Sequence, residues 1–435
     1  MFKTMVNAWK IEDLRNKILF TLFIIFIYRL GNVIPIPMIS QEGLAAMFGS
    51  FAQSGSTTFV GYLNMLTGGS FQQATIFALS ISPYITASII VQLLTMAIPA
   101  LERMVKEGGE EGRKKQAAIT RYATVALGLI QGFVYYVTLS RYNVIIDNNV
   151  WTAIIIIMTF SAGTALVMWL GELITNKGIG NGISMILFAG ILSRLPAYIS
   201  SAINYLSTAE NLALAITIVV IMLPMALVMV GFVVWVSEAE RRLPVQYAKR
   251  VVGRKVYGGQ ASFIPLKVNM TGVLPVIFAS SIVSMPAIIA SFFAPPAEGS
   301  FWAGFLKVTQ APSPVYIIFY VIFIIAFSFF YAYAQFNPIE IANNMKNNGG
   351  FIPGLRPGRP TAEYISRVMK NVTVMGALFL SLIAVLPILL SALDKNLGGM
   401  ALGGTTLLIV VGVALETVRA MESQMLMRHY KGFLD

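Results

Sequence analysis

The chain alternates between long apolar runs and shorter stretches that hold charged residues, glycine and proline. Ten runs approach or reach the roughly 20 apolar residues that a helix needs to cross a bilayer. Their expected limits are 18–34, 74–98, 122–139, 150–170, 183–203, 212–236, 273–293, 315–334, 372–393 and 403–420. The fifth run is interrupted by Arg194 and Pro196, and the tenth is short. The pattern predicts an all-α membrane protein with ten transmembrane helices.

Composition supports this prediction and removes several functions. Hydrophobic residues make up 57% of the 435 residues and charged residues 11%, less than half the charge of a typical soluble domain. There is no cysteine, and the single histidine is His429. Thiolate chemistry is excluded, and zinc sites built on paired histidines or histidine-dependent triads lose their support. We expect no metal, no cofactor and no enzymatic activity.

The net charge of +12 is unevenly placed. Ten spans would put both termini on one side of the membrane, together with 26 of the 31 basic residues. The opposite side would hold only Arg141, Arg194, Lys307 and Lys395, and Arg29 would lie inside the first span. By the positive-inside rule, we expect both termini in the cytoplasm.

The predicted span interiors are poor in ionisable groups. Spans two to nine contain no Asp, Glu, Lys or His, and Arg194 is their only charge. Proton-coupled carriers and intramembrane proteases generally need such groups at membrane depth. No glycine cluster has the ending of a phosphate loop, so a partner would have to supply any nucleotide.

Two spans contain stretches of small and hydroxylated residues with a proline, Ser80–Ser88 and Ser280–Pro286. Close helix packing is one explanation for such residues. Pro83 and Pro286 also favour kinks, because proline removes a helical hydrogen bond. Both helices are therefore candidates for elements that move.

A short apolar segment, Phe59–Leu66, precedes Thr67, Gly68 and Gly69. It is too short to cross a membrane. Two interpretations remain open at this point. The segment is either an interfacial helix on the outer surface or a re-entrant segment surrounded by protein or a water-filled cavity.

The cytoplasmic loops 237–268 and 335–370 are long and basic. Alternation in Val251–Tyr257 predicts a short hairpin in the first loop. Positive-inside topology alone can explain basic loops, but their length favours docking of an acidic protein or RNA. The docking candidates are Arg241, Arg242, Lys249, Arg250, Arg254, Lys255, Arg356 and Arg359, the last two of which lie between prolines.

Five stretches together resemble the SecY family, the channel subunits of the bacterial protein-export translocon. They are NPIEIANNMKNNGGFIPGLRPGRPTAEYI (337–365), GELITNKGIGNGISMILFAGI (171–191), SPYITASIIVQLL (82–94), PLKVNMTGVLPVIFASSI (265–282) and GGTTLLIVV (403–411). The resemblance implies an hourglass pore between two inverted pseudo-symmetric halves of five helices, at 1–205 and 206–435.

The resemblance also implies roles for individual residues. The pore ring would consist of Ile81, Ile85, Ile183, Leu187, Ile277 and Ile409. A re-entrant plug helix at about 57–70 would include Phe59, Val60, Tyr62, Leu63, Leu66, Gly68 and Gly69. A lateral gate would include Pro83, Ser88, Gln92, Ser281, Ser284 and Pro286.

The implied function is a protein-conducting channel in the bacterial cytoplasmic membrane that translocates unfolded polypeptides and releases signal or transmembrane segments sideways into the lipid bilayer. The implied partners are the SecE and SecG membrane subunits, the SecA ATPase, the ribosome, signal sequences and secretory precursors. Arg356 would match the family's key basic position. A secondary carrier for small solutes and an inert membrane scaffold are the competing hypotheses.

Overall fold

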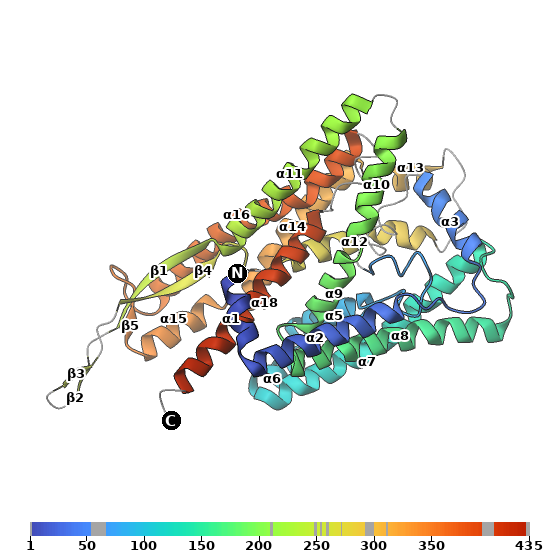
Figure 1. The fold of residues 1–435 in the computed structure, drawn as a ribbon. Helices are drawn as coiled ribbons and strands as arrows, with labels where there is room; N and C mark the ends of the chain where they lie inside the picture. The colour runs from blue at the N-terminus through green and yellow to red at the C-terminus, as the bar shows by residue number, and fades with distance from the viewer. Residues whose placement is uncertain are drawn as a thin grey trace. The chain divides into compact units, whose positions relative to one another are not determined.

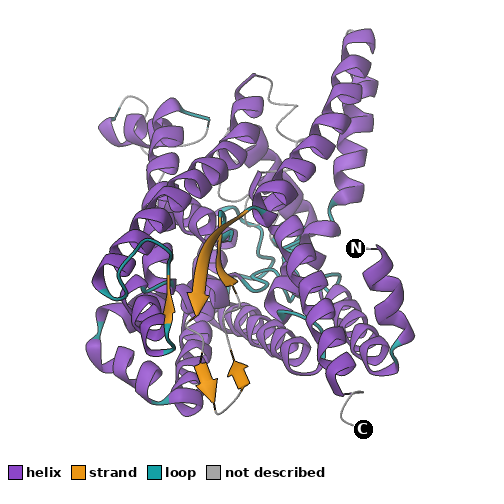
Figure 2. Ribbon diagram, turned by 90° about the vertical axis from the view of Figure 1, so that its left-hand side faces the viewer, coloured by secondary structure: helices purple, strands orange, loops and turns teal. Residues whose placement is uncertain are grey.

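The computed structural model describes residues 2–53, 67–208, 212–247, 250–252, 255–257, 261–270, 272–291, 300–309, 312–393 and 404–431. Helices dominate it (Figure 1), and the few strands are short (Figure 2). The chain divides into two compact units, each described here by itself. Unit 1 comprises 1–207, 284–311 and 409–435, and unit 2 comprises 208–283 and 312–408.

In the described part of unit 1 the named elements are all helices, joined by turns and isolated β-bridges. Its helices are α1 (Phe2–Lys10), α2 (Glu12–Gly31), α3 (Gln41–Gln53), α5 (Ser82–Ala97), α6 (Pro99–Glu107), α7 (Gly109–Arg141), α8 (Val150–Lys177), α9 (Gly182–Leu192), α10 (Leu195–Thr208), α13 (Phe301–Thr309) and most of α18 (Gly404–Lys431). The boundary between the units passes through α12 (Leu274–Ser291).

Unit 2 combines long helices with a small sheet. Its elements are α11 (Leu212–Glu238), β1 (Glu240–Tyr247), β2 (Arg250–Val252), β3 (Lys255–Tyr257), β4 (Ala261–Lys267), the first part of α12, α14 (Pro314–Gln335), α15 (Pro338–Asn347), β5 (Gly350–Phe351) and α16 (Arg359–Leu393).

Among the described residues, six helical segments are long and apolar enough to cross a membrane. They are α7, α8, α9 with α10, α14 with α15, α16 and α18. A seventh results if α5 and α6 are counted as one broken span, although their axes differ by 104°. The chain is therefore a multi-pass helical protein, and ten spans stay a prediction.

The second predicted span, 74–98, is helical only from Ser82 onward. Ala74 and Ser80 have positive φ angles of 45° and 46°, which a right-handed helix cannot accommodate. Pro83 consequently lies in the first turn of α5, where the missing N–H costs no hydrogen bond. The expected kink at Pro83 is wrong, because this proline lies in the first turn of the helix and not in its interior. Pro286, in contrast, does lie inside α12.

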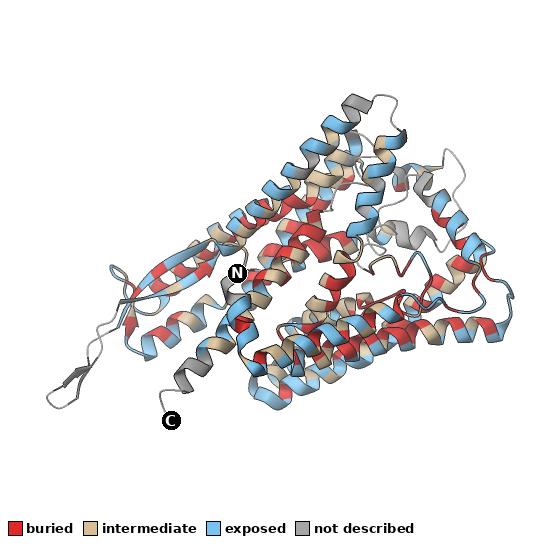
Figure 3. Ribbon diagram, viewed as in Figure 1, coloured by how far each residue is buried: buried red, intermediate tan, exposed pale blue. Residues whose placement is uncertain are grey.

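Aromatic rings hold the segment before α5 against the helices of unit 1. Many residues of this segment are buried, as the red parts of the ribbon in Figure 3 show. Phe71 stacks on Tyr135 of α7 at 4.4 Å between ring centroids, and Tyr135 contacts Phe160 of α8 at 5.0 Å. The Tyr135 hydroxyl donates to the Phe71 carbonyl. This pairing satisfies a phenol that would otherwise be buried without a partner.

Most side-chain hydroxyls in these helices bond within their own helix. Thr86, Thr120 and Thr124 each donate to the backbone carbonyl four residues earlier, at 3.1, 3.0 and 2.7 Å. A hydroxyl that is satisfied in this way needs no partner on the neighbouring helix. Among the described residues, these three threonines therefore add no polar contact between helices.

Candidate functional site

The two basic loops of unit 2 fold together into one module. β1 pairs antiparallel with β4 along its length, from Glu240 opposite Lys267 to Gln246 opposite Ala261. The other edge of β1 pairs with β5, where Gln246 lies opposite Phe351. The strand order is β4-β1-β5. We call this sheet, with α15 and the first turns of α16, the platform.

The platform has a hydrophobic core of its own, and the alternation along β1 shows why it forms. Leu243 and Val245 are buried while their neighbours Arg242, Pro244 and Gln246 are exposed, which is the pattern of a sheet covered on one face. The buried core residues are Leu243, Val245, Leu266, Ala342, Met345, Ile352, Ala362 and Ile365. Residues from both loops thus share one core.

Local signals in the sequence position α15 beneath the sheet. The Asn337 side chain accepts hydrogen bonds from the backbone N–H groups of Ile339 and Glu340, at 3.2 and 3.4 Å, and Pro338 occupies the first turn. At Gly350 the backbone packs closely against its neighbours: a Cβ at this position would lie 2.8 Å from Met345 Cγ and 2.9 Å from Tyr247 Cε1. Glycine is what lets β5 reach β1.

Arg242 lies on the exposed face of the sheet. Its Nε is 2.6 Å from Glu240 Oε1, and its guanidinium carbon lies 4.8 Å from the centroid of the Phe263 ring on β4. These contacts hold the side chain in place. Because Glu240 neutralises part of its charge, Arg242 contributes less to a docking field than an unpaired arginine would.

Arg356 is exposed on the segment between β5 and α16 and has no ion pair within 4.0 Å among the described residues. Its own carbonyl accepts a 2.8 Å hydrogen bond from the buried Thr361 hydroxyl. Gly354 and Gly358 flank it with φ angles of 83° and 105°. The loop thus presents an unneutralised guanidinium on a fixed backbone, which lowers the entropy lost on docking.

The other predicted docking residues are placed less fully. Arg359 is exposed and pairs with Glu363 at 3.3 Å, one turn along α16. Arg241 is exposed on β1. β2 and β3 form the hairpin that alternation predicted, with Arg250 opposite Tyr257 and Lys255 opposite Val252. Lys249 and Arg254 lie outside the described residues.

The predicted ring residues fall into both units. Ile81, Ile85, Ile183, Leu187 and Ile409 belong to unit 1, and Ile277 belongs to unit 2. Ile81, Leu187, Ile277 and Ile409 are buried, whereas Ile85 and Ile183 are half-buried. The ring stays a prediction.

The predicted gate residues lie on α5 and α12. Pro83 is buried, while Ser88, Gln92 and Pro286 are half-buried, and the side chain of Ser284 lies outside the described part. Ser280 and Ser281 both donate to the Ile277 carbonyl, at 2.8 and 2.9 Å. The hydroxyls of these two serines are therefore satisfied inside their own helix.

The predicted plug lies mostly outside the described residues, which leaves out Phe59, Val60, Tyr62, Leu63 and Leu66. Gly68 and Gly69 are described and have φ angles of 68° and 93°. A Cβ at Gly68 would lie 2.7 Å from both the Gly190 carbonyl oxygen and Ser193 Oγ. Glycine is required there for both backbone conformation and space.

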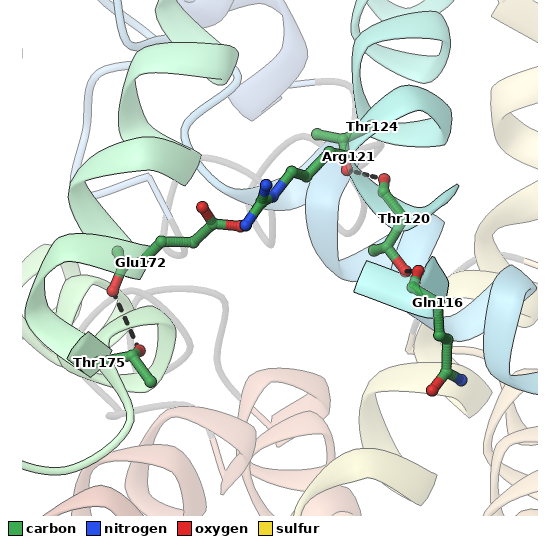
Figure 4. Close-up of polar contacts among 7 residues, drawn as sticks. Gln116, Thr120, Arg121, Thr124, Glu172 and Thr175 are labelled. Atoms are coloured by element: carbon green, nitrogen blue, oxygen red, sulfur yellow. Dashed lines mark hydrogen bonds and ion pairs between the residues drawn. The ribbon is translucent and has the colours of Figure 1, made fainter. Parts of the chain in front are cut away.

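Sequence reasoning missed a set of polar contacts that links α5, α7 and α8 in unit 1. Arg121 Nε lies 2.7 Å from Glu172 Oε1 and joins α7 to α8 (Figure 4). Gln116 Nε2 donates to Thr95 Oγ1 on α5 at 3.4 Å. A signal was present: Arg121 directly precedes the third predicted span and Glu172 follows the end of the fourth, so both lie on the predicted cytoplasmic side.

The fold and these surfaces define a multi-pass helical membrane protein with a basic platform built from two loops. Comparisons with known proteins then show the family. The family model described as SecY matches residues 75–418. The protein translocase subunit SecY of Streptomyces scabiei is 45% identical over the full length of both chains. The Thermotoga maritima counterpart is 41% identical over 100% of this chain and 98% of its own.

Solved structures show the same fold. A protein-conducting channel aligns with a TM-score of 0.64 and 17% identity, covering 94% of this chain and 92% of that one. Sec61 in a canine ribosome–channel complex from the endoplasmic reticulum aligns with a TM-score of 0.61 and 16% identity, at the same coverage. The chain therefore belongs to the SecY family, a family of translocation channels and not of enzymes. The resemblance found in the sequence is confirmed.

Proposed function

We propose that this chain is the protein-conducting subunit of a bacterial translocase in the cytoplasmic membrane. The observation that carries the proposal is the platform: two basic loops, far apart in the sequence, share one core and hold Arg356 exposed and unpaired. A solute carrier has no use for such a surface. A channel that is driven from outside needs a place for its motor to dock.

The proposed channel has ten spans in two inverted halves, with both termini in the cytoplasm. Branched aliphatic side chains at the ring positions would form its constriction. Such a ring offers a moving polypeptide neither hydrogen bonds nor charges, so it binds no sequence tightly, and it can exclude water when closed. The segment at about 57–70 would seal the closed pore as a plug.

The proposed lateral gate runs between α5 and α12. Hydroxyls on both helices bond to their own backbones, as Thr86 and Ser281 do. Separating these helices would therefore leave those hydroxyls paired. A signal sequence that binds between the open helices would shift the equilibrium toward the open state by its preference for that state.

The proposed partners follow from the surfaces and from the family. The platform would bind the SecA ATPase or the ribosome, because a basic surface attracts an acidic protein face or RNA. SecE and SecG would complete the membrane complex. Nascent secretory precursors would be the cargo.

The test is reconstitution of the chain with SecE and SecG in vesicles that receive SecA, ATP and a secretory precursor. We expect import that requires SecA and ATP, measured as precursor protected from added protease. Failure of import with an active motor and an unfolded precursor would contradict the proposal. Saturable solute uptake without the motor would favour a carrier instead.

Arg356→Glu isolates the docking step. We expect at least a tenfold loss of import, because the reversed charge repels the motor at the fixed loop, roughly the cost of 1.4 kcal/mol or more in binding. Arg359→Glu is the matched control: Arg359 is also exposed but already pairs with Glu363, so its reversal should cost less. Equal import by the two variants would refute the special role of Arg356.

A further inference from the structure

The helix α13 in unit 1 exposes a row of large apolar side chains. The exposed fractions are 88% for Phe301, 41% for Trp302, 39% for Phe305 and 44% for Val308. At 3.6 residues per turn, Phe301, Phe305 and Val308 share one face of the helix, and Trp302 lies at its edge. Leu306 is buried at 7% exposure and marks the side that faces protein. The helix thus turns an apolar, largely aromatic face outward.

This face is an ordered surface. Ser300 caps the start of the helix: its Oγ accepts from the Ala303 N–H at 3.2 Å, and its carbonyl accepts from the Gly304 N–H at 3.1 Å. The rings of Trp302 and Phe305 stack at 5.4 Å between centroids with an interplanar angle of 18°. The apolar groups are therefore held together on a capped helix.

Chain connectivity restricts where α13 can lie. Four residues separate its end at Thr309 from Pro314, the start of α14. Even fully extended, that link spans no more than about 18 Å. α14 belongs to one of the segments that can cross a membrane. The aromatic face is therefore tethered close to the place where a spanning helix begins.

The length of α13 decides between crossing the membrane and lying on it. Nine residues of helix extend only about 14 Å, roughly half the thickness of the hydrocarbon core. Tryptophan is enriched at the boundary between headgroups and acyl chains. Unit 1 offers a parallel: Trp151, 72% exposed, lies in the first turn of the spanning helix α8.

We propose that α13 lies in the plane of the outer headgroup–acyl boundary of the bilayer and inserts Phe301, Trp302, Phe305 and Val308 between lipids. The proposal rests on the membrane orientation given under the proposed function. It adds a lipid-binding surface on the connection between α12 and α14. With α13 held by lipid, the outer end of that connection has a fixed point while α12, which carries the gate residues Ser281 and Pro286, moves.

The test is depth-dependent fluorescence quenching in the full chain. In a variant whose other four tryptophans are phenylalanine, Trp302 reports on α13 in vesicles of phosphatidylcholine and phosphatidylglycerol. Brominated lipids carry the quencher at a shallow or a deep acyl position. We expect roughly twofold stronger quenching by the shallow lipid, as the depth of an interfacial helix requires. A single-tryptophan variant that keeps Trp151 is the positive control.

A water-exposed control and a variant of the face complete the design. Tyr247→Trp in a chain without other tryptophans places the reporter on the platform, where brominated lipid should not quench it. Phe301→Asp with Phe305→Asp should reduce quenching of Trp302 to that level, whereas Phe301→Leu with Phe305→Leu should retain it. The two double variants are compared at equal protein content, and equal thermal unfolding midpoints show that both are folded.

Three outcomes would overturn the proposal. Trp302 could be as insensitive to lipid as the platform control, or it could be quenched most by the deep lipid, which would place it in the hydrocarbon core. Quenching could also appear only at a low protein-to-lipid ratio, which would mean that a second copy of the chain covers the face at higher ratios. None of these outcomes depends on precursor import, so failure here is distinguishable from failure of the proposed channel function.

Discussion

The platform of unit 2 and the helix bundle of unit 1 are held together in different ways. In the platform, backbone hydrogen bonds join β1 to β4 and to β5, so segments far apart in the sequence are fixed in register. In the bundle, side-chain hydroxyls such as those of Thr120 and Thr124 bond to their own helix. Contacts between the helices are mostly apolar and include close approaches at glycine, as at Gly132 and Ile157.

The difference matters for a channel. Parting two strands leaves backbone groups unpaired, which carries a cost for each hydrogen bond lost. Parting two helices whose polar groups are internally satisfied costs mainly packing and apolar burial, which lipid or a hydrophobic signal sequence can replace. The platform is therefore suited to transmit force without deforming, and the bundle is suited to open. Two single substitutions and one double-mutant cycle test this contrast.

Leu243→Ala should have the largest effect, and this effect should be limited to the platform. Leu243 is 1% exposed in the core that both loops share. Its truncation should destabilise the platform by about 3 kcal/mol, from lost burial and the remaining cavity. Hydrogen exchange should accelerate in the amides of β1 and β4 and stay unchanged in α7 and α8. The exposed Gln246→Ala, on the same strand, is the control and should leave exchange nearly unaltered.

Equal acceleration in α7 and α8 would contradict the contrast, because it would mean that platform and bundle unfold as one cooperative unit. Acceleration of hydrogen exchange in the platform alone, together with loss of motor-driven import, would instead support the contrast between platform and bundle. The platform would then be a separately stable element on which docking depends.

Gly182→Ala should have the next largest effect and act on the bundle. A Cβ at Gly182 would overlap the Gly171 carbonyl oxygen of α8 and lie 2.7 Å from Ile174 Cβ. The backbone would have to move, at a cost of roughly 2 kcal/mol. Gly231→Ala in α11 is the control, since nothing lies within 4 Å of its Cβ position. Thermal unfolding in detergent should show a lower midpoint for the first variant only.

An unchanged midpoint for Gly182→Ala would show that α8 and α9 can shift apart without loss. The close contact at Gly182 would then contribute nothing to stability. The helices of the bundle would be as easily separated at their ends as along their length. A raised midpoint for Gly231→Ala would be compatible with the design, because alanine favours the helix by about 0.5–1 kcal/mol.

These elements also show which features a sequence can predict. Alternation in Val251–Tyr257 predicted the β2–β3 hairpin because both strands and their turn lie within a few residues. The pairing of β1 with β5 could not be predicted, since its register depends on the folded core. Apolar pattern placed the start of the second span too early, because hydrophobicity carries no information on the positive φ angles of Ala74 and Ser80.

The candidate site divides in the same way. Both Arg356 and Arg359 were predicted to dock a partner because they lie between prolines, and the resemblance singled out Arg356. The structure adds that the guanidinium of Arg356 has no ion-pair partner among the described residues, while that of Arg359 does. The link from Arg121 to Glu172 was missed because each residue alone looks like an ordinary charge at the end of a span. Only the packing of α7 against α8 brings them to 2.7 Å.

The Arg121–Glu172 pair should give the smallest effect and is the sharpest test of the bundle. If polar contacts between helices are incidental there, a double-mutant cycle with Arg121→Met and Glu172→Gln should yield a coupling of only about 0.3–1 kcal/mol. Their side chains are 52% and 25% exposed, so solvent screens the pair, and the coupling should weaken with added salt. Unfolding midpoints of the four proteins at low and high salt measure both quantities. A salt-independent coupling of about 3 kcal/mol or more would identify a desolvated pair, and α7 and α8 would then be locked by electrostatics, as the platform is by its backbone.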